Sequence, residues 1–307
     1  MREAIAADGD AHRALLAGDD AREPLRRAAD RYRASWEAAP PRSYGRLVGY
    51  AKASILAGED PAPYVHERLG EPDSPPAFWA LGLAALAAGD DDGAAVAAEG
   101  MRAGSDAFGR AADAVAALAR GDRDAYAAAV RAIVADFDAR EEHLTGVPIA
   151  DTALVLERLA ERRLLAAHPR SALLPAVDDV RAILTGTRVW AVVGCSPDPA
   201  RDSHRIAAML QRRGHRVHPV NPMATEILGE RCYPSLAALP GAVEVVDVFR
   251  RAAVAGAHVD EAIEVGARAV WMQLGVVDEQ AAERGRAAGL RVVMDRCPAI
   301  ELRRLGL

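Results

Sequence analysis

The chain of 307 residues is 51% hydrophobic and 27% charged but only 5% aromatic, so alanine and aliphatic residues carry most of its apolar content. This composition excludes disordered and collagen-like proteins, and the length favours two domains. No stretch of 18 uncharged apolar residues occurs, and charged residues interrupt the first thirty positions. We therefore expect a cytoplasmic protein without a membrane span or a signal peptide.

The charge is distributed unevenly along the chain. Residues 1–176 hold 21 basic and 28 acidic residues, a net charge of −7, whereas residues 177–307 hold 17 and 16, a net charge of +1. Binding to nucleic acid needs a basic face, so the acidic first half argues against such a partner. The second half remains open to a small anionic ligand.

Cysteines and histidines give no pattern of a metal site. Cys195, Cys232 and Cys297 form no C-x-x-C pair, and no H-E-x-x-H sequence is present. An odd number of dispersed cysteines also argues against a disulfide framework. We expect reduced thiols and no bound metal.

One short phrase, in which a helical run ends in glycine and an acid, recurs four times in the first half. The four copies are Leu16–Asp19, Leu56–Glu59, Ala87–Asp90 and Ala119–Asp122, and their glycines are 40, 31 and 32 residues apart. Glycine suits the left-handed residue that ends a helix, and an acid suits the start of the next one. Each phrase therefore predicts a joint between two antiparallel helices.

Helix pairs repeated at this spacing resemble the tetratricopeptide pattern, in which the units stack into an array. We expect residues 1–170 to form an all-α, tetratricopeptide-like helical array, with a generic helical bundle as the alternative. A last helix is expected from Asp151 to Arg163, followed by a domain boundary near residues 170–176. This half contains no catalytic constellation, so its expected role is interaction with a protein partner or regulation.

Apolar runs alternate with helical segments from Val177 onward. Five strands are predicted, at residues 188–193, 216–220, 243–248, 269–273 and 291–295. The nearly unbroken apolar character of the first run is typical of a strand buried on both faces. The alternation predicts an α/β domain over residues 177–307, with a parallel, doubly wound sheet of Rossmann type and a ligand site at the carboxyl ends of its strands.

The segment after the first predicted strand has the features of a phosphate-binding loop. Gly194 allows the backbone to approach a phosphate, and Ser196 and Ser203 offer hydroxyls. Arg201 adds a positive charge beside the start of a helix. The loop lacks the further glycines of G-x-G-x-x-G, and the second strand ends at Asn221 where a dinucleotide fold needs an acid, so NAD is disfavoured. A simple strand-to-helix connection stays open as the alternative.

Seven segments of the second half match a known pattern in order. They are Gly194–Ser203, Pro219–Pro222, Glu226–Gly229, Tyr233–Leu236, Val246–Arg250, Trp271–Val276 and Val293–Pro298. In these segments the chain resembles the small bacterial CoA-binding proteins and the CoA-binding domain of the succinyl-CoA synthetase alpha subunit. The resemblance covers nearly all of residues 177–307 and implies a Rossmann-type domain that binds CoA or an acyl-CoA.

The resemblance also implies the residues of the binding site. The phosphates of CoA would be held by Gly194, Cys195, Ser196, Arg201 and Ser203. The adenosine end would contact Val220, Asn221 and Pro222, while the nucleotide and pantetheine path would be bordered by Val248, Phe249 and Arg250, with Gln273 and Gly275 at the mouth of the fourth strand.

Cys195 stands where the family often has alanine. A thiol at a helix N-terminus can have a lowered pKa, but an inert small residue in a tight turn is the favoured interpretation.

The ligase half of a succinyl-CoA synthetase, with its phosphorylated histidine, is absent from this sequence, so no catalytic cycle is predicted. Three hypotheses follow. The first is a CoA or acyl-CoA binding protein with a helical array that recruits or regulates a partner. The second is an NADP-linked oxidoreductase, and the third is a protein-interaction scaffold whose Rossmann domain has no ligand.

Overall fold

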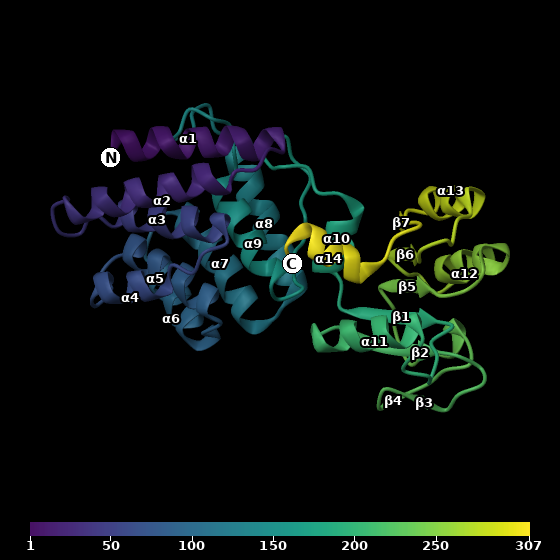
Figure 1. Cartoon of the computed structure of the whole chain (residues 1–307). Helices are drawn as coiled ribbons and strands as arrows, with labels where there is room; N and C mark the ends of the chain where they lie inside the picture. The colour runs from purple at the N-terminus through teal and green to yellow at the C-terminus, as the bar shows by residue number, and fades with distance from the viewer. The chain divides into compact units, whose positions relative to one another are not determined.

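A computed structural model describes residues 1–307 and divides them into two compact units, Met1–Val177 and Asp178–Leu307 (Figure 1). The first unit is helical, whereas the second combines a five-stranded parallel sheet with helices. The predicted fold class, an α/β region after an all-α region, is confirmed. No helix in the chain combines the length and apolar character needed to span a membrane.

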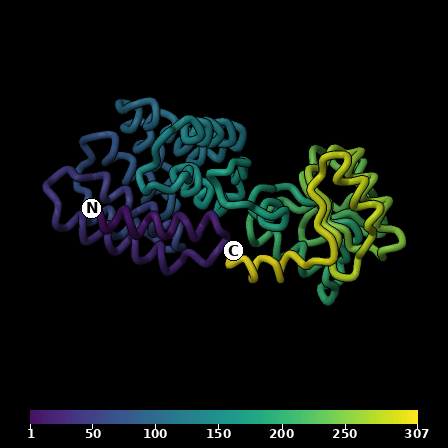
Figure 2. Tube along the Cα trace, turned by 90° about the horizontal axis from the view of Figure 1, so that it is seen from above, coloured from purple at the N-terminus to yellow at the C-terminus, as the bar shows by residue number.

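The first unit consists of helices, most of them joined by short connections, with residues 139–150 forming a longer one before the last helix. They are α1 (Arg2–Ala17), α2 (Arg22–Glu37), α3 (Tyr44–Ala57), α4 (Ala62–Leu69), α5 (Pro75–Ala88), α6 (Asp91–Met101), α7 (Asp106–Arg120), α8 (Arg123–Asp138) and α9 (Asp151–Glu161). Sequential helices pack against each other through most of the series, and Figure 2 shows α1 and α2, coloured purple, lying side by side. The tetratricopeptide-like interpretation stays a prediction.

The four predicted joints lie at the ends of α1, α3, α5 and α7. In each joint the glycine is left-handed, with φ between 68° and 86°. The N–H of the acid that follows donates to the carbonyl five residues back, at 2.8–2.9 Å. This pattern satisfies carbonyls that the helix end would otherwise leave unpaired.

The acids that follow the glycines start only two of the next helices. Asp90 and Asp122 accept hydrogen bonds from the backbone N–H three residues on, as N-caps of α6 and α8. At the first two joints the cap differs from the prediction, because Asp20 and Asp60, one position later, accept from the N–H two residues on. The N-cap positions of α2 and α4 are Ala21 and Pro61, which have no side-chain acceptor, and the carboxylate one position earlier binds the first N–H of the helix instead.

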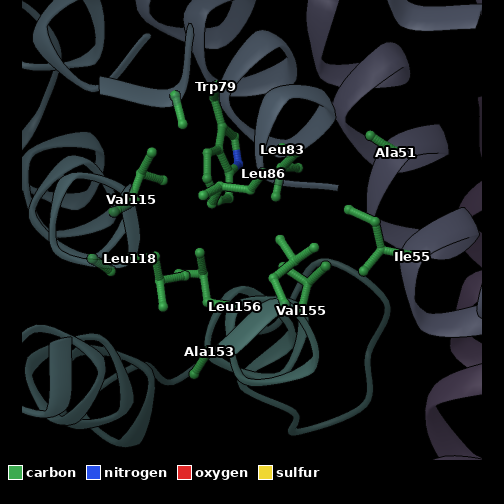
Figure 3. Close-up of a cluster of buried hydrophobic side chains, with 14 of the residues drawn as sticks. Ala51, Ile55, Trp79, Leu83, Leu86, Val115, Leu118, Ala153, Val155 and Leu156 are labelled. Carbon is green, nitrogen blue, oxygen red and sulfur yellow. The ribbon is translucent and has the colours of Figure 1, made fainter. Parts of the chain in front are cut away.

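Helix α9 packs against α3, α7 and α8. Figure 3 shows side chains of α3, α5, α7 and α9 pointing toward a common centre, among them Leu83 and Leu156, which are fully buried. Polar contacts fix α9 in place as well. The Lys52 ammonium of α3 donates to a carboxylate oxygen of Asp151 at 2.9 Å, and the Tyr126 hydroxyl of α8 donates to Glu157 at 2.7 Å.

The second unit begins with α10 (Asp179–Gly186) and alternates strands with helices. The elements of the main sheet and its cover are β1 (Val189–Val193), α11 (Asp202–Arg212), β2 (Arg216–Val220), β5 (Val245–Val248), α12 (Ala252–Glu264), β6 (Ala269–Met272), α13 (Glu279–Ala287), β7 (Arg291–Val293) and α14 (Pro298–Leu305). A hairpin of β3 (Glu226–Ile227) and β4 (Glu230–Arg231), and the short 3-10 helix η1 (Leu236–Ala238), lie between β2 and β5. The sequence analysis predicted the five main strands but not the hairpin, η1 or α14.

The strand order of the sheet is β2-β1-β5-β6-β7, and all neighbouring pairs are parallel. The chain builds outward from β1 in one direction to β2 and then in the other direction from β5 onward. At the end of β1, Val193 pairs with Val220 on one side and Val248 on the other. Ligands of such sheets bind at the carboxyl ends of the strands where the order reverses, which here is between β1 and β5.

Both faces of the sheet are buried, as the apolar runs predicted. Trp190, Val192 and Trp271 lie in the cluster that α10, α11 and α14 cover. Ala191 and Val193 point to the opposite face, into the cluster with α12 and α13. Figure 1 shows these two helical layers on either side of the strands.

Candidate functional site

The loops after β1 and β5 touch at Gly194. This glycine has φ +80°, and a Cβ atom there would lie 2.5 Å from the Phe249 carbonyl oxygen. The Gly194 N–H donates to the Val220 carbonyl at 2.9 Å, which ties the loop to the end of β2 as well. Only glycine fits at a left-handed residue with backbone packed against its missing side chain.

The loop from Gly194 to Ser203 is held by its own hydroxyl and carboxylate groups. The Ser203 hydroxyl accepts from the Ser196 N–H at 3.1 Å, and the Ser196 hydroxyl accepts from the Asp198 N–H at 3.1 Å. The Asp198 carboxylate accepts in turn from the Ala200 N–H at 2.9 Å. A hydroxyl that accepts a hydrogen bond keeps its own proton to donate, so both serines retain a donor for an anionic ligand.

Two helix N-termini begin beside this loop. Arg201 is the N-cap of α11 and Arg251 is the N-cap of α12, and neither helix has a side chain that caps its first N–H groups. Uncapped N–H groups and the positive end of the helix dipole favour an anion at each position.

A pocket of about 780 Å³ opens between the loops that follow β1, β2 and β5. Its lining consists of Gly194, Ser196, Arg201, Asp202, Ser203, Asn221, Phe249, Arg250, Arg251 and Val254. The position is the reversal of strand order described above, and the volume is in the usual range for small-molecule sites.

The electrostatics of the pocket are dominated by three arginines, Arg201, Arg250 and Arg251. Their side chains are exposed, and none of them has an ion pair within the protein. The one acid of the lining, Asp202, forms an ion pair with Arg205 of its own helix. The pocket therefore offers positive charge that the protein itself does not neutralise, which suits a polyanion.

Of the thirteen residues that the resemblance implied, seven line this pocket. They are Gly194, Ser196, Arg201, Ser203, Asn221, Phe249 and Arg250. The remaining six do not line it. Cys195, Val220 and Val248 are buried in the core, Gln273 is buried, and Pro222 and Gly275 are exposed elsewhere on the loops.

Cys195 has no access to solvent. Burial, with smaller contributions from the nearby Cys232 and Asp247, raises the pKa of its thiol to about 12. A thiol of this kind is not a nucleophile at neutral pH, so the structure favours the inert interpretation.

Asn221 uses its side chain within the protein. Its amide nitrogen donates to the Cys195 carbonyl at 2.8 Å, and its oxygen accepts from the Met223 N–H at 2.9 Å. The side chain thus joins the loop after β1 to the loop after β2. Asn221 therefore fixes the position of the loop after β1, and it also lines the pocket.

The Gln273 side chain is hydrogen-bonded to Asp247, a residue that was not among the predicted site residues. Its amide nitrogen donates to Asp247 at 2.6 Å, and the second carboxylate oxygen of Asp247 is buried without a partner. Asp247 is fully buried on β5, in register with Val192 of β1. Burial raises the pKa of this carboxyl, the hydrogen bond from Gln273 offsets part of the rise, and the resulting pKa is about 7. A carboxyl group that changes charge near neutrality therefore lies in the sheet interior.

The sequence analysis also missed Asp202, Arg251 and Val254. Arg251 directly follows the Val246–Arg250 segment, and the alanine-rich helix begins after it. In parallel sheets the helix N-terminus that follows a strand lies at the ligand edge. Arg251 and Val254 could therefore have been predicted from their positions at the start of this helix.

Known proteins are similar in sequence to the α/β unit. Residues 188–303 match the family model described as the CoA binding domain. YneT, an uncharacterised protein of Bacillus subtilis, is 35% identical over 123 residues, which are 40% of this chain and 91% of YneT.

Solved structures are similar over the same share of the chain. A hypothetical protein from Pyrococcus horikoshii is 38% identical, with 43% of this chain and 94% of that protein covered and a TM-score of 0.41. A protein from Thermus thermophilus is 34% identical, with 42% of this chain and 99% of that protein covered and a TM-score of 0.40.

Proposed function

This chain belongs to the CoA-binding domain family, and on that premise we propose that its α/β unit binds CoA or an acyl-CoA in the pocket between the loops after β1, β2 and β5. The observation that carries the proposal is the set of three arginines without carboxylate partners around this pocket. CoA carries a diphosphate and a 3′-phosphate, so its nucleotide end presents more negative charge than NAD.

The arrangement supports one orientation of the ligand. The diphosphate would lie on the loop from Gly194 to Ser203, where the N–H groups of α11 and the Arg201 guanidinium converge. The adenosine would lie toward the end of β2, beside Asn221, which is the one of the three residues implied for this end that lines the pocket. Arg250 and Arg251 then remain for the further phosphate or for the start of the pantetheine arm.

Isothermal titration calorimetry with CoA, dephospho-CoA and NADP tests the proposal. We expect CoA to bind more tightly than dephospho-CoA, which lacks the 3′-phosphate, and more tightly than NADP. Tighter binding of NADP, together with reduction of the cofactor by a substrate, would favour the oxidoreductase hypothesis instead. The pocket residues include no acid at the end of β2 for a ribose hydroxyl, which argues against NAD. NADP carries a 2′-phosphate and needs no such acid, so the calorimetric comparison with NADP is the test that separates the two hypotheses.

Arg201→Ala is expected to weaken CoA binding by roughly 1.5 to 3 kcal/mol, because a charge-assisted hydrogen bond to phosphate is lost. The matched control is Arg212→Ala, which removes an exposed arginine from the last turn of the same helix. The control should leave the affinity unchanged. Equal affinities for wild type and Arg201→Ala would contradict the proposed phosphate site.

For residues 1–170 we propose a tetratricopeptide-like helical array that interacts with a protein partner or regulates the CoA-binding residues 177–307. The support is the series of helix pairs joined at left-handed glycines. Residues 1–177, the whole helical unit, expressed alone should retain the partner in a pull-down. If they bind nothing while the full chain does, the partner site belongs to the α/β unit.

A further inference from the structure

The exposed apolar side chains of the α/β unit gather at one edge of its sheet. Five large apolar side chains of this unit are more than two-fifths exposed, and four follow the carboxyl ends of parallel strands. These are Met223 after β2 (90% exposed), Val254 after β5 (47%), and Leu274 and Val277 after β6 (57% and 47%); the fifth, Ile300, lies on α14. Carboxyl ends of parallel strands meet at one edge, so the four side chains all follow strands that end at the edge where the pocket opens.

Leu274 is held in its exposed position by a built turn. The Val276 N–H donates to the Gln273 carbonyl at 2.9 Å, and Gly275 at the third position of the turn has φ +75°. The Gly275 N–H donates to the Asp295 carboxylate at 2.7 Å, which fixes the turn to the end of β7. The exposure of Leu274 is therefore a property of an anchored turn and not of a free loop.

The apolar residues continue from the pocket in one direction. Val254 and Phe249 are themselves part of the pocket lining. The strand order puts β6 beside β5, on the side away from β1 and β2. Leu274 and Val277 thus follow the pocket on the side opposite to Met223 and to the proposed adenosine end.

We propose that Val254, Leu274 and Val277, here named the apolar rim, receive the aliphatic acyl group of a CoA thioester. This inference rests on the CoA site proposed above. The charges of CoA all belong to its nucleotide end, and the neutral pantetheine arm leads away from the diphosphate to the thioester. The three arginines match the first end, and the apolar rim matches an uncharged hydrocarbon at the other.

The rim also sets the class of acyl group. Each methylene removed from water contributes up to about a fourfold gain in affinity. A dicarboxylic acyl group such as succinyl would bring a carboxylate against valine and leucine, where it loses solvation without gaining a partner. The ligand class is therefore an acyl-CoA with an aliphatic chain, in preference to free CoA or succinyl-CoA.

Calorimetry with CoA, acetyl-CoA, hexanoyl-CoA and succinyl-CoA tests the inference on the full chain. Hexanoyl-CoA has four more methylenes than acetyl-CoA, and we expect it to bind at least tenfold more tightly. Succinyl-CoA should bind no more tightly than acetyl-CoA. The double variant Leu274→Ser/Val277→Ser should lose most of the hexanoyl advantage and keep the affinity for CoA.

Met223→Ser is the matched control, because it removes a still more exposed apolar side chain from the other side of the pocket. It should leave the ratio of hexanoyl-CoA to acetyl-CoA affinity unchanged. All three substitutions are at exposed positions, and circular dichroism will show that the variants fold.

Two results overturn the inference and are distinct from failure of the proposed function. If CoA binds but the four ligands have affinities within twofold of each other, the rim does not receive an acyl chain. If sedimentation velocity shows a wild-type dimer that Leu274→Ser/Val277→Ser converts to monomer, the rim is covered by a second copy of the chain. If none of the four ligands binds, the CoA site itself is refuted, and the inference falls with it.

Discussion

In the helical unit the charged groups nearest to the core are paired, whereas in the α/β unit three arginines around the pocket have no carboxylate partner. Lys52, the one lysine of the chain, donates to both Asp151 and Thr152. Burial alone would raise the pKa of Asp151, but Lys52 lowers it below its ordinary value. By contrast, Arg201, Arg250 and Arg251 face the pocket and solvent.

This difference separates charge that maintains the fold from charge that is available to a ligand. A partly buried pair is costly to break, because the remaining charge keeps its desolvation penalty. An exposed arginine has little such penalty, and its removal costs little stability. Substitutions in the two units should therefore affect different measurements.

The largest loss of stability is expected from Lys52→Met in the helical unit. This variant leaves Asp151 without its cation, and we expect the free energy of unfolding to fall by about 3 kcal/mol. Arg250→Met, the corresponding change at the pocket, should alter stability by less than about 0.5 kcal/mol while it weakens CoA binding. Denaturant unfolding and calorimetry measure the two quantities.

The double variant Lys52→Met/Asp151→Leu provides the control, because it removes both charges and should recover part of the lost stability. If Lys52→Met unfolds at the same denaturant concentration as the wild type, the pair is not structural and the contrast between the units is wrong.

A smaller effect is expected from glycine substitutions in the two units. Gly121→Ala at the end of α7 and Gly194→Ala after β1 both introduce a side chain at a positive φ. A Cβ at Gly121 meets nothing within 4 Å, so the cost should be about 1 kcal/mol. At Gly194 it meets the Phe249 carbonyl at 2.5 Å, so the loops must also move apart.

We therefore expect Gly194→Ala to cost about 2 kcal/mol of stability and to abolish detectable CoA binding. Gly121→Ala should leave CoA binding intact. Thermal unfolding and calorimetry on both variants give the comparison, and equal effects on CoA affinity would show that the contact between the two loops is not needed for the site.

The last comparison concerns the dependence of stability on pH. Asp247 has a pKa of about 7 in the folded protein and an ordinary carboxyl pKa when unfolded, so the folded state binds more protons between about pH 4 and pH 7. Asp247 therefore makes stability fall as the pH rises through this window, by at most about 1.4 kcal/mol per pH unit. Asp247→Asn removes this dependence.

The measurement is the difference in free energy of unfolding between Asp247→Asn and wild type at each pH. His215, whose pKa burial lowers to about 4, contributes the opposite slope, but it is present in both proteins and cancels. We expect the difference to favour Asp247→Asn increasingly between pH 4 and pH 7 and to be constant above. A constant difference across the whole range would show that Asp247 does not titrate in this window.

The sequence alone was sufficient to predict the local elements and the edge of the sheet at which the pocket opens. Glycine ends a helix because it adopts a positive φ without strain, and a continuous apolar run suits a strand that is buried on both faces. Both signals depend only on neighbouring residues in the chain, so the joints and the five strands were predictable. The acids after the first two glycines were misassigned as caps because the length of the connection decides which carboxylate reaches the free N–H groups.

Tertiary structure decided which side chains of the predicted motif are free to meet a ligand. Asn221 and Gln273 have the chemistry of ligand-binding residues, but partners from other loops and strands engage them. Cys195 lies in the loop, but its thiol points into the core. Arg251 and Val254 join the pocket because the sheet brings the loop after β5 against the loop after β1. Residue type and spacing are set along the chain, whereas exposure and hydrogen-bond partners depend on contacts between segments that are distant in sequence.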